Sequence, residues 1–191
     1  MRSLTGLAQV LAVVFLVSAV VEAVRTLAAS LWLAGLLPEG PASIVYGGAF
    51  VLMMLATMVL VPALAFFSWR AASNVLAREP DFYQSPGGAA VAWLIPGWNL
   101  YKPYDALTSI WAASANLIPG DEPHGPGRLL ELFWIAWVLS IVIGRLGGGG
   151  SDDAFVGFGD VLGASLSAAS CVAGALVVTR LARLQDQVPA A

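Results

Sequence analysis

The side chains best placed for chemistry in this sequence are an arginine and two asparagines near the middle of the chain. Arg70 and Asn74 are four residues apart, so on a helix they share one face and could hold a phosphate, a carboxylate or a backbone carbonyl. The structural alternative is that Arg70 extends to lipid phosphates while Asn74 satisfies a helix end or the loop backbone. Asn99 follows Pro96 and Gly97 inside an apolar run, where an unpaired amide is costly. It either lines a solute site or pins its loop to neighbouring helices.

Three further charged residues interrupt or flank apolar segments. Glu22 and Arg25 are three residues apart, a spacing that allows a local ion pair. Buried acidic groups in membrane helices also mark proton or ion pathways. Asp160 either joins such a pathway with Glu22 or stabilises the N-terminus of a helix. The sequence leaves both alternatives open.

The sequence contains few residues that could catalyse a reaction. A nucleophile needs an adjacent base, but the chain has one histidine, His124, in a loop rich in proline and glycine. The only cysteine, Cys171, excludes a disulfide within one chain. We therefore expect no enzyme, no cofactor and no metal site. The chain also lacks the basic surface that nucleic acid requires, so we expect no nucleic-acid partner.

Composition indicates which elements position these groups. The chain of 191 residues is 59% hydrophobic and 11% charged, with a mean hydropathy of +0.81, whereas soluble domains carry about 25% charged residues. Apolar segments long enough to cross a bilayer cover residues 6–28, 44–68, 129–146 and 155–178. We predict an all-α integral membrane protein with four transmembrane helices, forming a single membrane domain over residues 1–191.

The distribution of basic residues predicts the orientation. With four crossings, seven of the nine basic residues fall on one side: Arg2, Arg70, Arg78, Lys102, Arg128, Arg180 and Arg183. Because basic flanks stay in the cytoplasm, both termini are predicted to be cytoplasmic, with the glycine-rich connection 147–153 outside. The abundance of arginine, alanine and glycine is typical of a GC-rich bacterial genome, so we expect a bacterial inner membrane.

A cytoplasmic loop over residues 82–116 departs from a plain helical bundle. Pro96 and Gly97 should break any helix there, and Pro103 suits the first turn of a new one. From Pro103 onward apolar residues recur at helical spacing, which predicts a short amphipathic helix lying on the membrane. The segment is therefore predicted to be interfacial or re-entrant. The aromatic side chains of this segment, together with that of Trp69 just before it, should lie at the level of the headgroups. The segment contributes Trp93, Trp98, Tyr101, Tyr104 and Trp111.

Three ordered blocks carry a family resemblance. They are residues 67–74 (FSWRAASN), 92–104 (AWLIPGWNLYKPY) and 110–114 (IWAAS), and residues 177–185 (VVTRLARLQ) add a basic last helix. This succession resembles the bacterial membrane proteins of domain-of-unknown-function family 4328. The resemblance implies a four-helix membrane protein and brings no activity with it.

The last apolar segment carries a stripe of small residues at four-residue spacing, which lets another helix approach closely. The stripe consists of Gly159, Gly163, Ser167, Cys171 and Ala175. It predicts close packing within the chain or, alternatively, a homo-oligomer contact.

The sequence therefore predicts a non-enzymatic membrane interaction or scaffold module. Its cytoplasmic aromatic and basic platform would contact lipid headgroups or an unidentified membrane or cytoplasmic protein. The candidate contact residues are Trp69, Arg70, Asn74, Trp98, Asn99, Lys102, Tyr104 and Trp111. The alternative is a small transporter or channel subunit with a site near the break at 96–97 and Asn99.

Overall fold

A computed structural model describes residues 3–118, 126–147 and 157–188 of the chain. Four of its helices are long and apolar enough to cross a membrane: α1 (Thr5–Leu33), α2 (Glu39–Leu76), α5 (Gly127–Gly147) and α6 (Phe158–Gln187). The prediction of an all-α membrane protein with four spanning helices is thus confirmed. The helices α1, α2 and α5 extend beyond the predicted segments at both ends, α6 extends beyond its segment at the C-terminal end, and α2 continues through Pro62.

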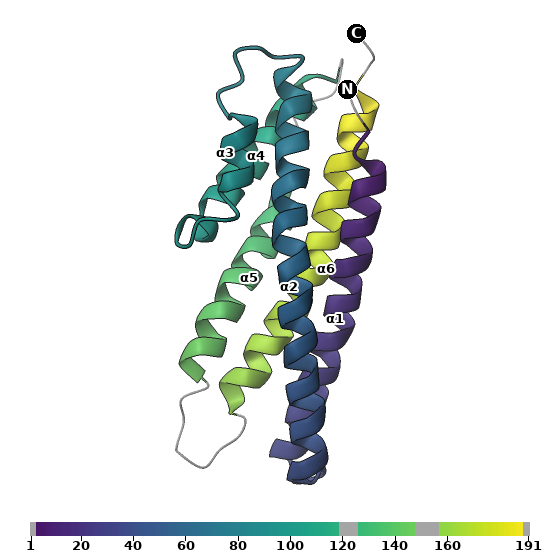
Figure 1. Cartoon of the computed structure of the whole chain (residues 1–191), viewed down its shortest axis with the longest axis vertical. Helices are drawn as coiled ribbons and strands as arrows, with labels where there is room; N and C mark the ends of the chain where they lie inside the picture. The colour runs from purple at the N-terminus through teal and green to yellow at the C-terminus, as the bar shows by residue number, and fades with distance from the viewer. Residues whose placement is uncertain (1–2, 119–125, 148–156, 189–191) are drawn as a thin grey trace.

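The long helices form a bundle (Figure 1). In it α1 packs against both α2 and α6, and α6 also packs against α5. The helices α2 and α5 make little contact with each other. Both termini lie at the same end of the bundle (Figure 1), where Ser3 and Thr5 contact the carboxylate of Asp186. The short connection between α1 and α2 therefore lies at the opposite end.

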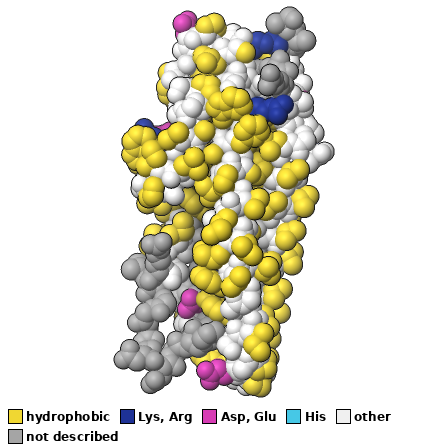
Figure 2. Space-filling view, in the orientation of Figure 1, with side chains coloured by type: hydrophobic (Ala, Val, Ile, Leu, Met, Phe, Trp, Pro, Cys, Tyr) yellow, Lys and Arg dark blue, Asp and Glu magenta, His cyan; other side chains and the backbone are white. Residues whose placement is uncertain are grey.

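The surface of the bundle matches a lipid environment. Exposed apolar side chains line the outer faces of α1 and α2, including Val13, Val20, Val51 and Met58. Figure 2 shows hydrophobic side chains over the middle of one face, with the visible Lys and Arg side chains toward the end that holds the termini. Apolar side chains exposed in this way are stable only where lipid replaces water.

The small residues of α6 serve packing within the chain. Gly163 lies against α5 so closely that a Cβ there would be 3.2 Å from the Cα of Gly144. A Cβ at Gly174, a position that the predicted stripe missed, would be 2.8 Å from Cζ of Phe15 on α1. Because lipid is as apolar as these helices, close contact of this kind is what associates them.

We predict that Gly163→Ala lowers stability, because its methyl group would meet backbone atoms that cannot rotate away. Overpacking of this kind costs about 1–3 kcal/mol. Gly48 in α2 is the matched control, since a Cβ there meets nothing within 4 Å and Ala is the better helix former by about 1 kcal/mol. Melting temperatures in detergent check this, and equal melting of the two variants would contradict the close α5–α6 contact.

A hairpin of shorter helices lies beside α2 at the end that holds the termini (Figure 1). It comprises α3 (Pro86–Val91), the 3₁₀ turn η1 (Trp98–Leu100) and α4 (Lys102–Asn116). Gly97 has a φ of 85°, a conformation that glycine adopts without strain, so the predicted helix break is confirmed. Pro103 lies in the first turn of α4 as predicted.

The environment of α4 differs from the prediction. Its apolar face is buried against other helices of the chain, which include α2 and α6, and Trp111 is only 7% exposed. The prediction that the rings of Trp111 and Trp93 lie against headgroups is therefore wrong, because protein covers both. Helical periodicity reveals an apolar face but not whether protein or lipid covers it. Arg2, His124 and most of the connections 119–126 and 147–153 lie outside the described residues.

Candidate functional site

The tip of the hairpin, residues 92–101, exposes apolar side chains although its backbone is firmly held. Trp98 is 49% exposed, and Leu94, Leu100 and Tyr101 are exposed to a similar degree. Trp93 points inward and donates from Nε1 to Oγ of Ser68 at 2.9 Å. The tip is therefore a fixed apolar projection and not a loose loop.

Trp134 of α5 is the second anchor of this tip. Its Nε1 donates to the backbone carbonyl oxygen of Leu100 at 2.9 Å. The centre of its ring lies 5.0–6.2 Å from the centres of four other aromatic rings, those of Trp93, Tyr104, Phe133 and Trp137. The sequence analysis missed Trp134; two tryptophans three residues apart in the third apolar segment were the available signal.

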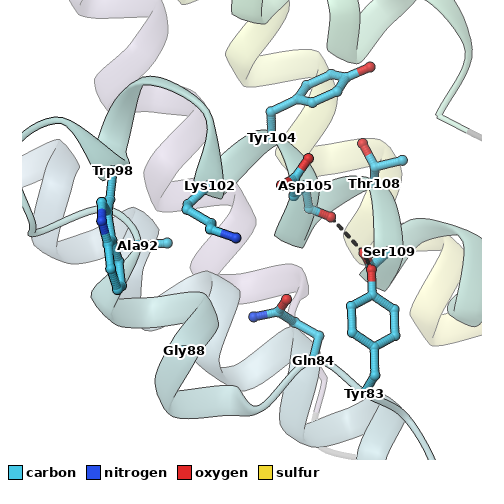
Figure 3. A pocket seen from close by; sticks show the side chains of 10 residues that line it. All are labelled: Tyr83, Gln84, Gly88, Ala92, Trp98, Lys102, Tyr104, Asp105, Thr108 and Ser109. Atoms are coloured by element: carbon cyan, nitrogen blue, oxygen red, sulfur yellow. Dashed lines mark hydrogen bonds between the residues drawn. The ribbon is translucent and has the colours of Figure 1, made fainter.

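A pocket of about 470 Å³ lies between α3 and α4, next to the hairpin tip; we call it the hairpin pocket. Three predicted residues line it, Trp98, Lys102 and Tyr104. Its other lining residues are Tyr83, Gln84, Gly88, Ala92, Asp105, Thr108 and Ser109. Figure 3 shows the side chains of Lys102 and Gln84 directed into the space between the helices, while the ring of Tyr104 points away.

The hairpin pocket carries unused hydrogen-bonding capacity. Oγ1 of Thr108 is buried and has no hydrogen-bond partner among the described residues, whereas the hydroxyls of Tyr83 and Ser109 contact each other. Lys102 is exposed, with Nζ 5.4 Å from the centre of the Tyr101 ring. The lining also includes the carboxylate of Asp105, so an anionic oxygen would bind where it reaches Lys102 and the hydroxyl of Thr108 and stays apart from that carboxylate.

The predicted pairing of Arg70 with Asn74 around a ligand is replaced by a different arrangement. Asn74 is buried and donates from Nδ2 to Oε1 of Gln185 on α6 at 2.9 Å. Nε2 of Gln185 in turn donates to Oγ of Ser114 on α4 at 2.9 Å and to the carbonyl of Ala71 at 3.1 Å. Gln185 therefore joins α6 to both α2 and α4. Sequence reasoning did not single out Gln185 because its partners lie more than 70 residues away.

The other two predicted residues on α2, Trp69 and Arg70, take no part in these hydrogen bonds. Trp69 is 40% exposed and stacks on Phe66 with the ring centres 5.6 Å apart. Arg70 is half-buried, and its Nε is buried without a hydrogen-bond partner among the described residues.

A second cavity, of about 510 Å³, lies within the bundle; we call it the groove cavity. Asn99 and Glu22 both line it. Arg25 Nε is 2.7 Å from Glu22 Oε2, so the predicted ion pair is confirmed. Tyr46, which the sequence analysis did not single out, connects this ion pair to Asp160. The Arg25 guanidinium lies 5.4 Å from the centre of the Tyr46 ring. The Tyr46 hydroxyl donates a hydrogen bond to Asp160 at 2.9 Å.

Asp160 also accepts a hydrogen bond from the backbone N–H of Gly157 at 2.9 Å, at the start of α6. Its predicted role at a helix N-terminus is thereby confirmed. The chain of contacts from Glu22 to Asp160 connects α1, α2 and α6 at the end of the bundle opposite the termini.

Comparison with the curated proteins and with the solved structures finds no match. A family model described as a domain of unknown function (DUF4328) matches residues 40–184, which include α2, the hairpin, α5 and nearly all of α6. This match agrees with the resemblance carried by the blocks at 67–74, 92–104 and 110–114. The chain belongs to the DUF4328 family.

Proposed function

We propose that this protein is a non-catalytic membrane module that binds lipid headgroups through its hairpin, on the cytoplasmic face of a bacterial inner membrane. The observation that carries the proposal is that Trp98 and Lys102 line one polar pocket directly beside an exposed apolar tip. An exposed apolar projection is stable where hydrocarbon covers it. An amphipathic ring next to a lysine is the arrangement favoured at a membrane interface.

The chemistry of the hairpin pocket supports a phosphate-bearing headgroup. Lys102 supplies a positive charge, Gln84 and Thr108 supply neutral donors, and the ring of Trp98 supplies an apolar surface for the acyl chains. The basic residues near the end that holds the termini support a cytoplasmic location for this face. Lipid is preferred to a protein partner because the apolar tip and the apolar bundle surface would then contact the same bilayer.

We predict that Lys102→Gln weakens retention of a single phospholipid several-fold, because the pocket loses its cation. Native mass spectrometry of protein released from mild detergent, with phosphatidylglycerol as the added lipid, measures the retained fraction. Arg180→Gln is the matched control, since Arg180 is exposed on α6 and does not line the pocket. Equal retention in both variants would rule the pocket out, and a stoichiometric protein in place of lipid would favour the protein-partner alternative.

A transporter or channel subunit is the second candidate, favoured by one observation: Asn99 and Glu22 line the same cavity. Under that function, replacing either residue abolishes flux of the solute in proteoliposomes while phospholipid retention at Lys102 is unchanged.

A further inference from the structure

We infer that the groove cavity is a binding site for a hydrophobic cation, a molecule with an apolar or aromatic body and one positive charge. This inference concerns a different cavity from the hairpin pocket and does not depend on the proposed headgroup function. It rests on three features of the groove cavity: its opening, its charge and its aromatic lining.

The packing of the helices places the opening toward lipid. The cavity is lined by residues of α1, α2, α5, α6 and the hairpin tip. Because α1 packs on both α2 and α6 while α2 and α5 make little contact with each other, we place the mouth of the cavity between α2 and α5. Met54 and Phe50 on α2, both about half exposed, line this side. A ligand dissolved in the membrane can therefore enter from the bilayer.

The charged groups lie at one end of the cavity and favour a cation. Among the described side chains that line it, Glu22 and Asp160 are acidic and Arg25 is basic, which leaves one net negative charge. An anion entering from lipid would meet two carboxylates in a medium of low dielectric constant, where such repulsion is strong. A cation would balance the charge.

Glu22 is the buried carboxylate of the cavity. The residue is 3% exposed, and its Oε2 lies 2.7 Å from Arg25 Nε. Ser167 on α6, which also lines the cavity, is a hydrogen-bond partner of the same carboxyl group. A positive charge bound beside this carboxylate would be attracted strongly, because water is excluded there.

The rest of the lining suits an apolar, aromatic body. Phe15, Phe133, Trp137 and Trp93 border the cavity together with Leu60 and Leu64. Aromatic faces attract cations, by about 2 kcal/mol where water is excluded. The volume of about 510 Å³ falls within the usual range of small-molecule sites, about 300–1,000 Å³.

Binding of radiolabelled tetraphenylphosphonium to the protein in lipid nanodiscs tests the inference, with empty nanodiscs subtracted as background. Tetraphenylborate is the matched probe, since it has nearly the same shape and the opposite charge. We expect saturable binding of the cation and none of the anion. Equal or tighter binding of tetraphenylborate would overturn the inference, as would the absence of saturable cation binding.

Substitutions locate the site. Glu22→Gln should weaken binding of tetraphenylphosphonium at least tenfold, while Glu39→Gln should leave it unchanged, because Glu39 is an exposed carboxylate at the start of α2 and does not line the cavity. Met54→Trp fills the mouth without touching the ion pair and should block binding in a protein that still melts like the parent. If Glu22→Gln does not fold, Met54→Trp still tests whether the cation binds in the groove cavity. Unchanged binding in Met54→Trp would place the cation elsewhere and overturn the inference.

Discussion

Trp134→Ala is expected to be the most damaging single substitution in the chain, lowering the free energy of unfolding by about 3–5 kcal/mol. The change removes a buried ring that packs against four other aromatic side chains. It also removes the donor that holds the carbonyl oxygen of Leu100 at the hairpin tip. Unfolding in mixed micelles measures the loss of stability. Trp69→Ala is the control of equal size, and a much smaller loss is expected there because Trp69 is 40% exposed.

A milder variant separates the two roles of Trp134. Trp134→Phe keeps aromatic packing but cannot donate to Leu100, a loss of about 1 kcal/mol. Hydrogen exchange of the backbone amides in residues 92–101 should speed up in this variant, because one of the two anchors of the tip is gone. Exchange as slow as in the parent would show that the Trp134–Leu100 bond does not hold the hairpin.

Gln185→Leu is expected to have the second largest effect, because it removes three buried hydrogen bonds that join α6 to α2 and α4. The bonds lost are those of Gln185 with the Asn74 carboxamide, the Ser114 hydroxyl and the carbonyl of Ala71. A hydrogen bond of this kind contributes about 0.5–1.5 kcal/mol. Thermal unfolding in detergent, followed by the loss of monodisperse protein, checks the expected fall in stability.

A double-variant cycle tests whether this loss comes from the bond to Asn74. Combining Asn74→Leu with Gln185→Leu removes both members of the pair, so the double variant should be less destabilised than the sum of the two single variants. Strict additivity would mean that the two side chains are not coupled in the folded protein.

The sequence was sufficient for features that depend on residues close together in the chain. Long apolar runs predicted the four spanning helices. Local backbone chemistry predicted the break at Pro96 and Gly97 and the helix that begins near Pro103. The ion pair between Glu22 and Arg25 followed from their spacing on one helix.

Features that depend on distant residues could not be predicted in the same way. The apolar face of α4 has the same periodicity whether lipid or protein covers it, so the burial of Trp111 could not be foreseen. The partner of Asn74 lies 111 residues away, and nothing in the spacing indicates it. The groove cavity exists only because α2 and α5 make little contact with each other, which is a property of the tertiary arrangement.

The bonds of Gln185 have a consequence for the biosynthesis of the protein. This residue lies in the last turn of α6, yet it completes the contacts of Asn74 and Ser114, which a ribosome would produce much earlier. The hairpin therefore reaches its final packing only after the last membrane helix has been translated and inserted. A chain cut short before this residue would lack all three hydrogen bonds by which Gln185 ties α6 to α2 and α4.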